Sequence, residues 1–172
     1  MIDSDSLSGR AWVFGDDINT DVLAPGIYMK GAIENLASHC LESVMPEFAG
    51  RVQAGDIIIA GENFGIGSSR EQAAEVLKTL GVSAIIARSF GGIFYRNAIN
   101  FGLLAVTYKA HHEIASGDQL HFDIQAGLLK NQATQTLLVC EVIPPHLMKI
   151  IAAGGLVAHL EQNFSQGRGI AN

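Results

Sequence analysis

The segment from Gly61 to Glu71 combines a glycine-rich turn with two serines and an arginine. It reads Gly-Glu-Asn-Phe-Gly-Ile-Gly-Ser-Ser-Arg-Glu and lies between an Ile-rich run and a helical pattern. At the start of a helix, main-chain N–H groups and the helix dipole attract anions. A short hydroxyl beside a forked guanidinium is well suited to hold a carboxylate there. Ser68, Ser69 and Arg70 are therefore candidates for binding a small carboxylate.

Two other interpretations of this segment compete with carboxylate binding. A nucleotide-binding loop would need a lysine after its last glycine, or a third glycine at the position of Arg70, and the chain has neither. The Ser-x-x-Glu spacing of Ser68 and Glu71 also fits a capping box, in which both side chains satisfy free N–H groups at the helix start. That structural interpretation stays open on spacing alone, although it leaves the two glycines and the arginine unexplained.

The elements on either side of this segment predict parallel β-α-β crossovers. Continuous β-branched runs are typical of strands buried on both faces, and glycines after two helical patterns are typical C-terminal caps. In chain order we expect strands at Ala11–Phe14 and Asp56–Ala60, a helix at Glu71–Leu80, a strand at Ser83–Ala87, a helix at Gly92–Asn100 and a strand at Leu103–Val106. Such a succession places helices on a parallel sheet.

The second half of the chain changes to short alternating strands. We expect strands at Asp118–Ile124, Leu128–Lys130 and Thr136–Val142, and a last helix that begins at Pro144-Pro145. The region Ile33–Phe48 is predicted to be helical and broken at Pro46. Together these elements predict an α/β fold in a three-layer β/β/α arrangement. We expect residues 1–172 to form one domain with an ordered core at about 9–161 and polar ends that fray.

Composition limits the partners and the compartment. With 48% hydrophobic and 16% charged residues, the chain is typical of a globular protein. A net charge of −6 disfavours a general electrostatic grip on nucleic acid. No apolar run reaches the roughly 18–20 residues that span a bilayer, and the polar N-terminus does not resemble a signal peptide. We therefore expect a cytoplasmic protein that binds neither nucleic acid nor a membrane.

Metal chemistry would have to come from another chain. Cys40 and Cys140 are the two cysteines, whereas an iron–sulfur cluster normally needs three or four thiolates. The histidines His111, His112 and His121 are too scattered to predict a metal site. We expect no metal site in this chain, and we expect both cysteines to be buried as small apolar residues.

Four motifs in a fixed order resemble the swivel domain of the aconitase superfamily, and most closely the small subunits of 3-isopropylmalate dehydratase and homoaconitase. One is the Gly-x-Gly-Ser-Ser-Arg-Glu segment itself. Upstream stands Phe-Gly-Asp-Asp-Ile-Asn-Thr-Asp at 14–21. Downstream follow Gly81–Phe90 with Ile93–Asn100, and then Ile150–Val157. The resemblance covers about residues 9–161.

This resemblance implies a hydro-lyase subunit that is inactive alone and closes over a large subunit carrying a [4Fe–4S] cluster. The implied reaction isomerises a 2-hydroxy di- or tricarboxylate by dehydration and rehydration, and the implied fold is the swivelling domain of the aconitase C-terminal type. By motif position, Ser68 is the base that removes a proton α to a carboxylate. The implied substrate-binding residues are Ser69, Arg70, Asp21 and Lys30, and the supporting residues are Thr20, Gly65, Gly67 and Arg96.

Two of these roles have plain structural alternatives. Asp21 could be an ordinary turn or helix-start residue. Lys30 lies in Pro25–Gly31, which resembles the family's specificity loop, and it could be a solvated surface lysine. If Lys30 points inward, the variable arm of the substrate is polar or anionic, which weighs against isopropylmalate and favours homoaconitase or another dehydratase of this kind.

The chain also departs from the family pattern. Ile66 makes the turn more apolar, Gln72 replaces a titratable histidine, and Gly91-Gly92 removes a positive charge. None of these changes removes the proposed base. A different class of function, a non-catalytic anion-binding or regulatory module, remains the competing hypothesis, and the retained Ser68 and Arg70 argue against it.

Overall fold

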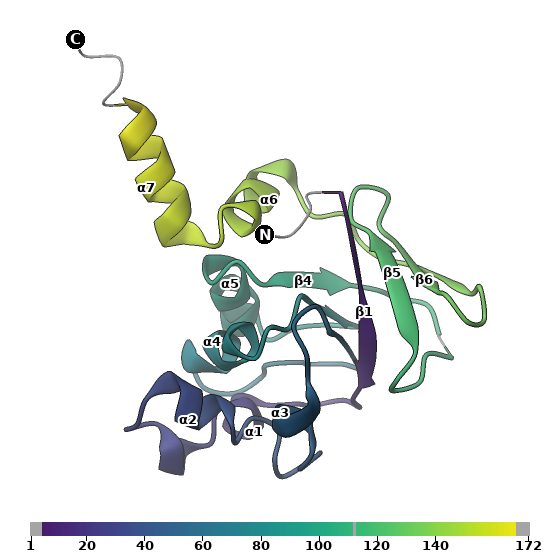
Figure 1. Ribbon diagram of the computed structural model, residues 1–172, viewed down its shortest axis with the longest axis horizontal. Coiled ribbons are helices and arrows are strands. Elements are labelled where there is room, and N and C mark those ends of the chain that lie inside the picture. The colour runs from purple at the N-terminus through teal and green to yellow at the C-terminus, as the bar shows by residue number, and fades with distance from the viewer. Residues whose placement is uncertain (1–4, 112, 168–172) are drawn as a thin grey trace.

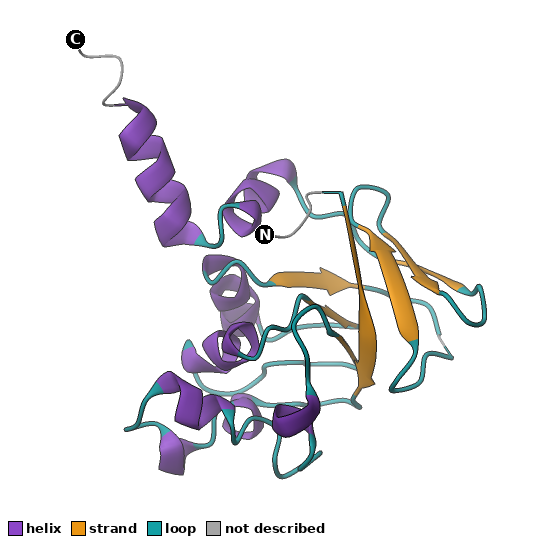
Figure 2. Cartoon of the chain, in the orientation of Figure 1, coloured by secondary structure: helices purple, strands orange, loops and turns teal. Residues whose placement is uncertain are grey.

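The structure of the protein is a computed structural model that describes residues 5–111 and 113–167. Its strands form one mixed sheet in the order β4-β3-β2-β1-β5-β6-β7 (Figures 1 and 2). The strands are β1 Ser6–Val13, β2 Ile57–Ala60, β3 Ala84–Ala87, β4 Leu104–Thr107, β5 Gln119–Asp123, β6 Leu128–Asn131 and β7 Leu137–Val139. The helices are α1 Thr20–Leu23, the 3-10 helix η1 Gly26–Tyr28, α2 Ile33–Ala37, α3 Phe48–Arg51, α4 Gln72–Thr79, α5 Gly92–Asn100, α6 Pro145–Ala152 and α7 Leu156–Gly167.

Strand β1 joins a parallel half of the sheet to an antiparallel half. Its second part, Ala11–Val13, pairs in parallel with β2, which continues through β3 to β4. Its first part, Ser6–Arg10, pairs antiparallel with β5, which continues through β6 to β7. The parallel strands β2 and β3 are buried on both faces, as their continuous apolar runs predicted.

Two hydrophobic cores separate three layers. One face of the parallel strands packs against the helices α1 to α5, and the other face packs against the antiparallel strands, which lie to the right in Figure 2. Neighbouring residues of β2 alternate between the cores: Ile58 belongs to the helical side and Ile57 and Ile59 to the strand side. The predicted β/β/α arrangement is therefore the one observed.

The predicted helix at Ile33–Phe48 is wrong for most of its length. Within this region only Ile33–Ala37, which is α2, forms a helix. Turns follow it, and the next helix, α3, begins at Phe48. Leu41 takes a left-handed φ of 62°, and its N–H donates to the Val22 carbonyl at 3.0 Å. Because Leu41 is fully buried, this long-range contact overrides local helical propensity.

Regular structure extends beyond the expected core at both ends. Strand β1 begins at Ser6 because its first residues pair with β5, and α7 continues to Gly167. None of the helices in the described residues is long and apolar enough to span a membrane.

The position of the Gly61–Glu71 segment follows from this topology. The carboxyl ends of β1 and β2 meet at one edge because the two strands are parallel neighbours. The opposite end of β2 is held by Asp56, whose carboxylate accepts from the Trp12 indole at 2.8 Å and from Arg10 at 2.9 Å. Burial alone would raise the pKa of Asp56, but hydrogen bonds from Trp12, the Gln53 amide and Arg10 lower it overall.

Candidate active site

The turns that follow β1 and β2 are joined by main-chain hydrogen bonds. The Gly65 N–H donates to the Ile18 carbonyl at 2.7 Å, and the Thr20 N–H donates to the Ile66 carbonyl at 2.9 Å. Asn19 and Ile66 form a parallel bridge at the same place. The two family-like motifs are thus one structural unit, although Thr20 and Ser68 are 48 residues apart in the chain.

The two glycines of the turn permit this close approach. Gly65 has a φ of +76°, and a Cβ added there would lie 2.1 Å from Cγ of Phe94. Gly67 has a φ of +117°, and its added Cβ would lie 2.9 Å from Oγ1 of Thr20. Both positions therefore need glycine for backbone conformation and for space. They let the two turns approach each other closely.

Ser68 is bonded to Thr20 and does not cap the following helix. The Ser68 N–H donates to Thr20 Oγ1 at 3.0 Å, and the two side-chain oxygens lie 3.1 Å apart. Helix α4 begins only at Gln72, and its N-cap residue Glu71 makes no side-chain capping bond. The capping-box interpretation is therefore wrong, because tertiary contacts hold the serine elsewhere.

The direction of the Thr20–Ser68 hydrogen bond follows from proton counting. Thr20 is 1% exposed, and a buried hydroxyl needs an acceptor for its single proton. Its Oγ1 already accepts from the Ser68 N–H, and Ser68 Oγ is the one acceptor in contact with it among the described residues. Thr20 therefore donates to Ser68 Oγ. Ser68 itself is exposed, so its own proton faces the open side of the turn.

Arg70 and Asp21 form an ion pair that joins the same two turns. Arg70 Nη1 contacts Asp21 Oδ1 and also donates to the Ala24 carbonyl at 3.1 Å. Asp21 stands in the first turn of α1, whose N-cap Asn19 accepts from the Val22 N–H. Asp21 is thus a helix-start residue and the partner of Arg70 at the same time.

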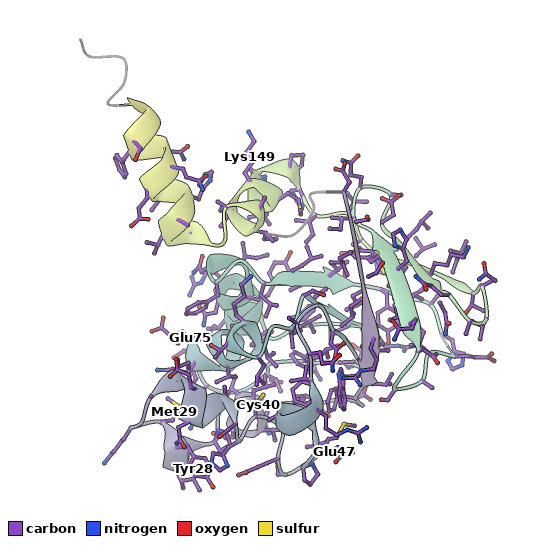
Figure 3. The ribbon with its side chains drawn as sticks, viewed as in Figure 1. Tyr28, Met29, Cys40, Glu47, Glu75 and Lys149 are labelled. Atoms are coloured by element: carbon purple, nitrogen blue, oxygen red, sulfur yellow. The ribbon has the colours of Figure 1, made fainter. Side chains whose placement is uncertain are left out.

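Other proposed site residues make no such contacts. Ser69 is exposed next to Ser68. Lys30, just after η1, and Arg96, on α5, are exposed and form no hydrogen bond or ion pair among the described residues. Near Lys30, the Tyr28 ring stacks on His39 with ring centroids 3.6 Å apart, at the outer edge of the helical layer (Figure 3). The structure thus brings Ser68, Thr20, Arg70 and Asp21 together.

A polar network that the sequence did not reveal holds the start of the turn. The Glu62 N–H donates to Asp16 Oδ1 at 2.7 Å, and the Glu62 carboxylate accepts from Ser89 Oγ at 2.7 Å. Ser89 Oγ in turn accepts from the Asn63 N–H at 2.8 Å. Asp16 and Ser89 each belong to a family-like motif, but nothing in the residue types indicated that they meet at this turn.

Two residues that depart from the family pattern lie in or against the turn. Ile66 is 43% exposed beside Ser68. The Gly91 N–H donates to the Phe64 carbonyl at 2.8 Å, and a Cβ at Gly91 would lie 2.7 Å from the Gly65 carbonyl oxygen. The chain therefore passes unusually close to the turn at Gly91.

The cysteines and histidines form no metal centre in the described residues. No group of three His, Cys, Asp or Glu side chains there could hold a metal ion. Burial raises the pKa of the Cys140 thiol to about 12 and also raises the pKa of Cys40. His39 contacts Glu42 at 2.6 Å, and His112 lies outside the described residues.

Comparisons with known proteins identify the class to which this fold and turn belong. The aconitase C-terminal domain family matches residues 32–111. A 3-isopropylmalate dehydratase small subunit 1 of Thermotoga maritima is 48% identical, with 92% of this chain and 97% of that protein covered. A methanogen homoaconitase small subunit of Methanothermobacter thermautotrophicus is 43% identical, with 94% of each chain covered.

A solved structure agrees over nearly the whole chain. A crystal structure of 3-isopropylmalate dehydratase from Methanocaldococcus jannaschii has a TM-score of 0.88 and 41% identity, and the match covers 95% of this chain and 99% of that one. The chain belongs to the family of small subunits of 3-isopropylmalate dehydratase and homoaconitase in the aconitase superfamily. The motif resemblance and the fold class are confirmed, and the small-subunit names imply a large-subunit partner.

The packing of Gly65 generates a prediction about stability. Gly65→Ala is expected to lower the free energy of unfolding by about 2–4 kcal/mol, because the new Cβ meets Phe94 and a positive φ is strained. Gly92→Ala is a matched control, since no atom lies within 4 Å of its added Cβ. It should change stability by less than about 1 kcal/mol. Urea unfolding measures both, and equal effects would contradict the packing argument.

Proposed function

We propose that this chain is the small subunit of a two-subunit iron–sulfur hydro-lyase, with 3-isopropylmalate dehydratase of leucine biosynthesis as the leading assignment. The observation that carries the proposal is the exposed Ser68 hydroxyl, which accepts from buried Thr20 beside the Arg70–Asp21 pair. We further propose that residues 1–172 act as one swivelling domain in the cytoplasm, and that the chain is inactive without its large subunit.

Ser68 acts as the base that removes a proton α to a carboxylate of the substrate. A serine hydroxyl is a poor base in water, so Ser68 first gives up its own proton to solvent on the exposed side of the turn. The alkoxide that this leaves must be stabilised before it accepts the proton from the substrate. Thr20 donates to Ser68 Oγ, and this hydrogen bond strengthens when the oxygen becomes anionic. The positive charge of nearby Arg70 contributes in the same direction. These contacts lower the cost of forming the alkoxide at Ser68.

Arg70 and Ser69 bind a carboxylate of the substrate. The guanidinium is held at one nitrogen by Asp21 and the Ala24 carbonyl, which leaves its other donors for the ligand. A pre-positioned arginine loses little freedom when the carboxylate arrives, so binding costs less entropy. Asp21 therefore acts through Arg70 as a positioning residue.

The iron–sulfur cluster belongs to the large subunit in this family. When bound there, it supplies a Lewis acid for the substrate hydroxyl and a carboxylate. This chain has no part in ligating it, because Cys40 and Cys140 are buried with raised thiol pKa values. The role of this chain is to bring Ser68 and Arg70 to a substrate held on the partner.

A homoaconitase small subunit is the second candidate, and Lys30 favours it. Lys30 is exposed and has no partner in the described part of the chain, so its ammonium is available to a carboxylate arm of the substrate. A 43% identical relative is named a homoaconitase small subunit. A non-catalytic anion-binding module is disfavoured, because simple binding does not require a hydroxyl that accepts from a buried threonine. The net charge of −6 argues against nucleic acid or an anionic membrane as the ligand.

Replacement of Ser68 tests the base directly. In complex with its large subunit, Ser68→Ala should lower kcat by about 10²- to 10⁴-fold, the usual contribution of a positioned base. Assembly of the variant with the large subunit, measured by sedimentation, should be unchanged. Ser43→Ala, at an exposed serine far along the chain, is the control and should keep normal turnover. Full activity of Ser68→Ala would overturn the assignment.

Replacement of Thr20 tests the hydrogen bond to Ser68. Thr20→Val keeps the shape but removes both the donor to Ser68 Oγ and the acceptor for the Ser68 N–H, so kcat should fall by roughly 10- to 100-fold while KM changes little. Thr20→Ser restores the hydroxyl and should recover most of kcat. A loss that serine does not rescue, or one confined to KM, would show that Thr20 only supports the fold.

Replacement of Lys30 separates the two candidate substrates. For the leading assignment, the complex should prefer a 2-hydroxy dicarboxylate with an isopropyl arm, and Lys30→Val should change its kcat/KM by less than about threefold. Lys109→Val, at another exposed lysine, controls for the loss of charge. A preference for a carboxylate arm that Lys30→Val reduces tenfold or more would establish the homoaconitase-type assignment instead.

A further inference from the structure

The chain between α1 and α2 forms a short loop that lies against Arg70. We call residues 25–31 the η1 loop, because the 3-10 helix η1 occupies its centre. A Cβ added at Gly26 would lie 3.7 Å from Nη2 of Arg70, which is an ordinary contact distance. Nη1 of the same guanidinium is already held by α1 and its C-terminal end. A ligand that binds the remaining donors of Arg70 therefore lies beside the η1 loop.

The η1 loop has an outer face and an inner face. Ile27 is 81% exposed, and Lys30 is exposed as well. Tyr28 and Met29 are half-buried and pack against the hydrophobic core under the helices, at the outer edge of the helical layer (Figure 3). The side chains that could touch a ligand thus belong to the same short segment as the side chains that anchor it.

The anchor of the loop is an aromatic stack between Tyr28 and His39, which lies in the turn after α2. The ring centroids are 3.6 Å apart, and the ring planes differ by only 7°. The His39 ring is itself held, because its Nδ1 lies 2.6 Å from Oε2 of Glu42. A carboxylate only accepts hydrogen bonds, so Nδ1 donates and the plane of the imidazole is set. Tyr28 therefore packs on a ring whose orientation is already fixed.

The turn that carries the stack is tied to the arginine site through α1. The Leu41 N–H donates to the Val22 carbonyl at 3.0 Å, and Leu41 is fully buried. Val22 follows Asp21, which pairs with Arg70. The contacts therefore run in a closed ring from the guanidinium through α1 to the turn, across the stack to the η1 loop, and back to the guanidinium.

We propose that His39 is a positioning residue that holds the η1 loop at a set distance from Arg70 and thereby governs the choice between substrates with different variable arms. This inference rests on the proposed function, because it takes Arg70 as a carboxylate site. A carboxylate bound there places the rest of the ligand beside the loop, where Ile27 and Lys30 are exposed. Close contact with either side chain discriminates between arms only if the loop is held in place.

One stacked pair is sufficient to control a loop of this length. Loss of an aromatic stack shifts an equilibrium by roughly 2- to 10-fold, and the loop has few other side chains packed on the core. We therefore expect changes of this size in loop opening and in substrate preference. A histidine that only supported the fold would instead change the stability of the whole chain and affect every substrate equally.

Trypsin cleavage after Lys30 measures loop opening in the chain alone. Cleavage after Lys109, in a different exposed segment, is the internal reference. Relative to that reference, His39→Ala should raise the rate of cleavage after Lys30 by roughly 2- to 10-fold. His39→Phe keeps a ring for stacking and should restore most of the protection. His146→Ala, at an exposed histidine of α6, is the matched control and should change neither rate.

Removal of the other ring makes the test independent of any one variant. Tyr28→Leu should raise cleavage after Lys30 by a similar factor, and Tyr28→Phe should not. Tyr28→Leu combined with His39→Ala should give no further increase, because both changes remove the same contact. Circular dichroism checks that each variant is folded. Fully additive effects would show that the two rings act separately, and the proposal would fail.

Substrate preference in the complex with the large subunit tests the consequence for the reaction. Two 2-hydroxy acids that differ only in their variable arm, isopropyl or carboxylate, give a ratio of kcat/KM values. His39→Ala should reduce that ratio by roughly 2- to 10-fold, mainly through KM. The kcat for the preferred substrate should change by less than about twofold, because the Thr20–Ser68 contact is untouched. His39→Phe should restore the ratio.

Three results would overturn the proposal: cleavage after Lys30 that His39→Ala leaves unchanged, an equal loss of kcat/KM for both substrates, or a loss confined to kcat. The cleavage measurement needs neither substrate nor large subunit, so it separates this inference from the proposed function. If Ser68→Ala kept full turnover while His39→Ala still opened the loop and lowered the ratio, the base assignment would fall and the role of His39 would stand.

Discussion

The pairing of the turns after β1 and β2 is the constraint on which the rest of the site depends. Two main-chain hydrogen bonds, from Gly65 to Ile18 and from Thr20 to Ile66, bring the turns into contact. Contact at this distance excludes a side chain at Gly65 and places buried Thr20 under Ser68. The hydroxyl is thus aimed by backbone geometry, and it needs no neighbouring acidic or basic side chain to hold it.

The same geometry bears on the proposal that this acidic chain receives an anionic substrate. The net charge of −6 repels anions at long range, so attraction must be local. Arg70 supplies that local charge, and its ion pair with Asp21 lowers the net attraction while fixing the direction of the guanidinium. The ion pair therefore fixes the orientation of the guanidinium but weakens the attraction of Arg70 for an anion.

Much of the fold was predictable because its signals are local. Strands β2 and β3 are uninterrupted apolar runs, and α5 was predicted with its observed bounds because glycines mark its two ends. The region Ile33–Phe48 failed because its conformation is set by a distant partner: the buried Leu41 bonds to Val22. Helical periodicity cannot report such a contact.

For the candidate site too, the sequence indicated which residues take part, but not which contacts they make. The serines, the arginine and Asp21 were visible as motif residues, and Thr20 as a supporting one. What the sequence could not show is that Ser68 leaves the helix start to meet Thr20, or that Arg70 is held by the Ala24 carbonyl. Every residue has a main-chain carbonyl, so a sequence cannot indicate which one Arg70 will contact. The capping-box spacing, for its part, predicted the wrong partner for Ser68.

Two different kinds of exposed surface lie near the two ends of α5. At its beginning lies a polar turn whose hydroxyl and guanidinium have capacity for a charged ligand. Beyond its end, Val157 and Phe164 on α7 are 70% and 72% exposed, and such apolar exposure costs free energy until another apolar surface covers it. Because hydrophobic contact is non-directional, covering these side chains would not constrain the angles that position Ser68.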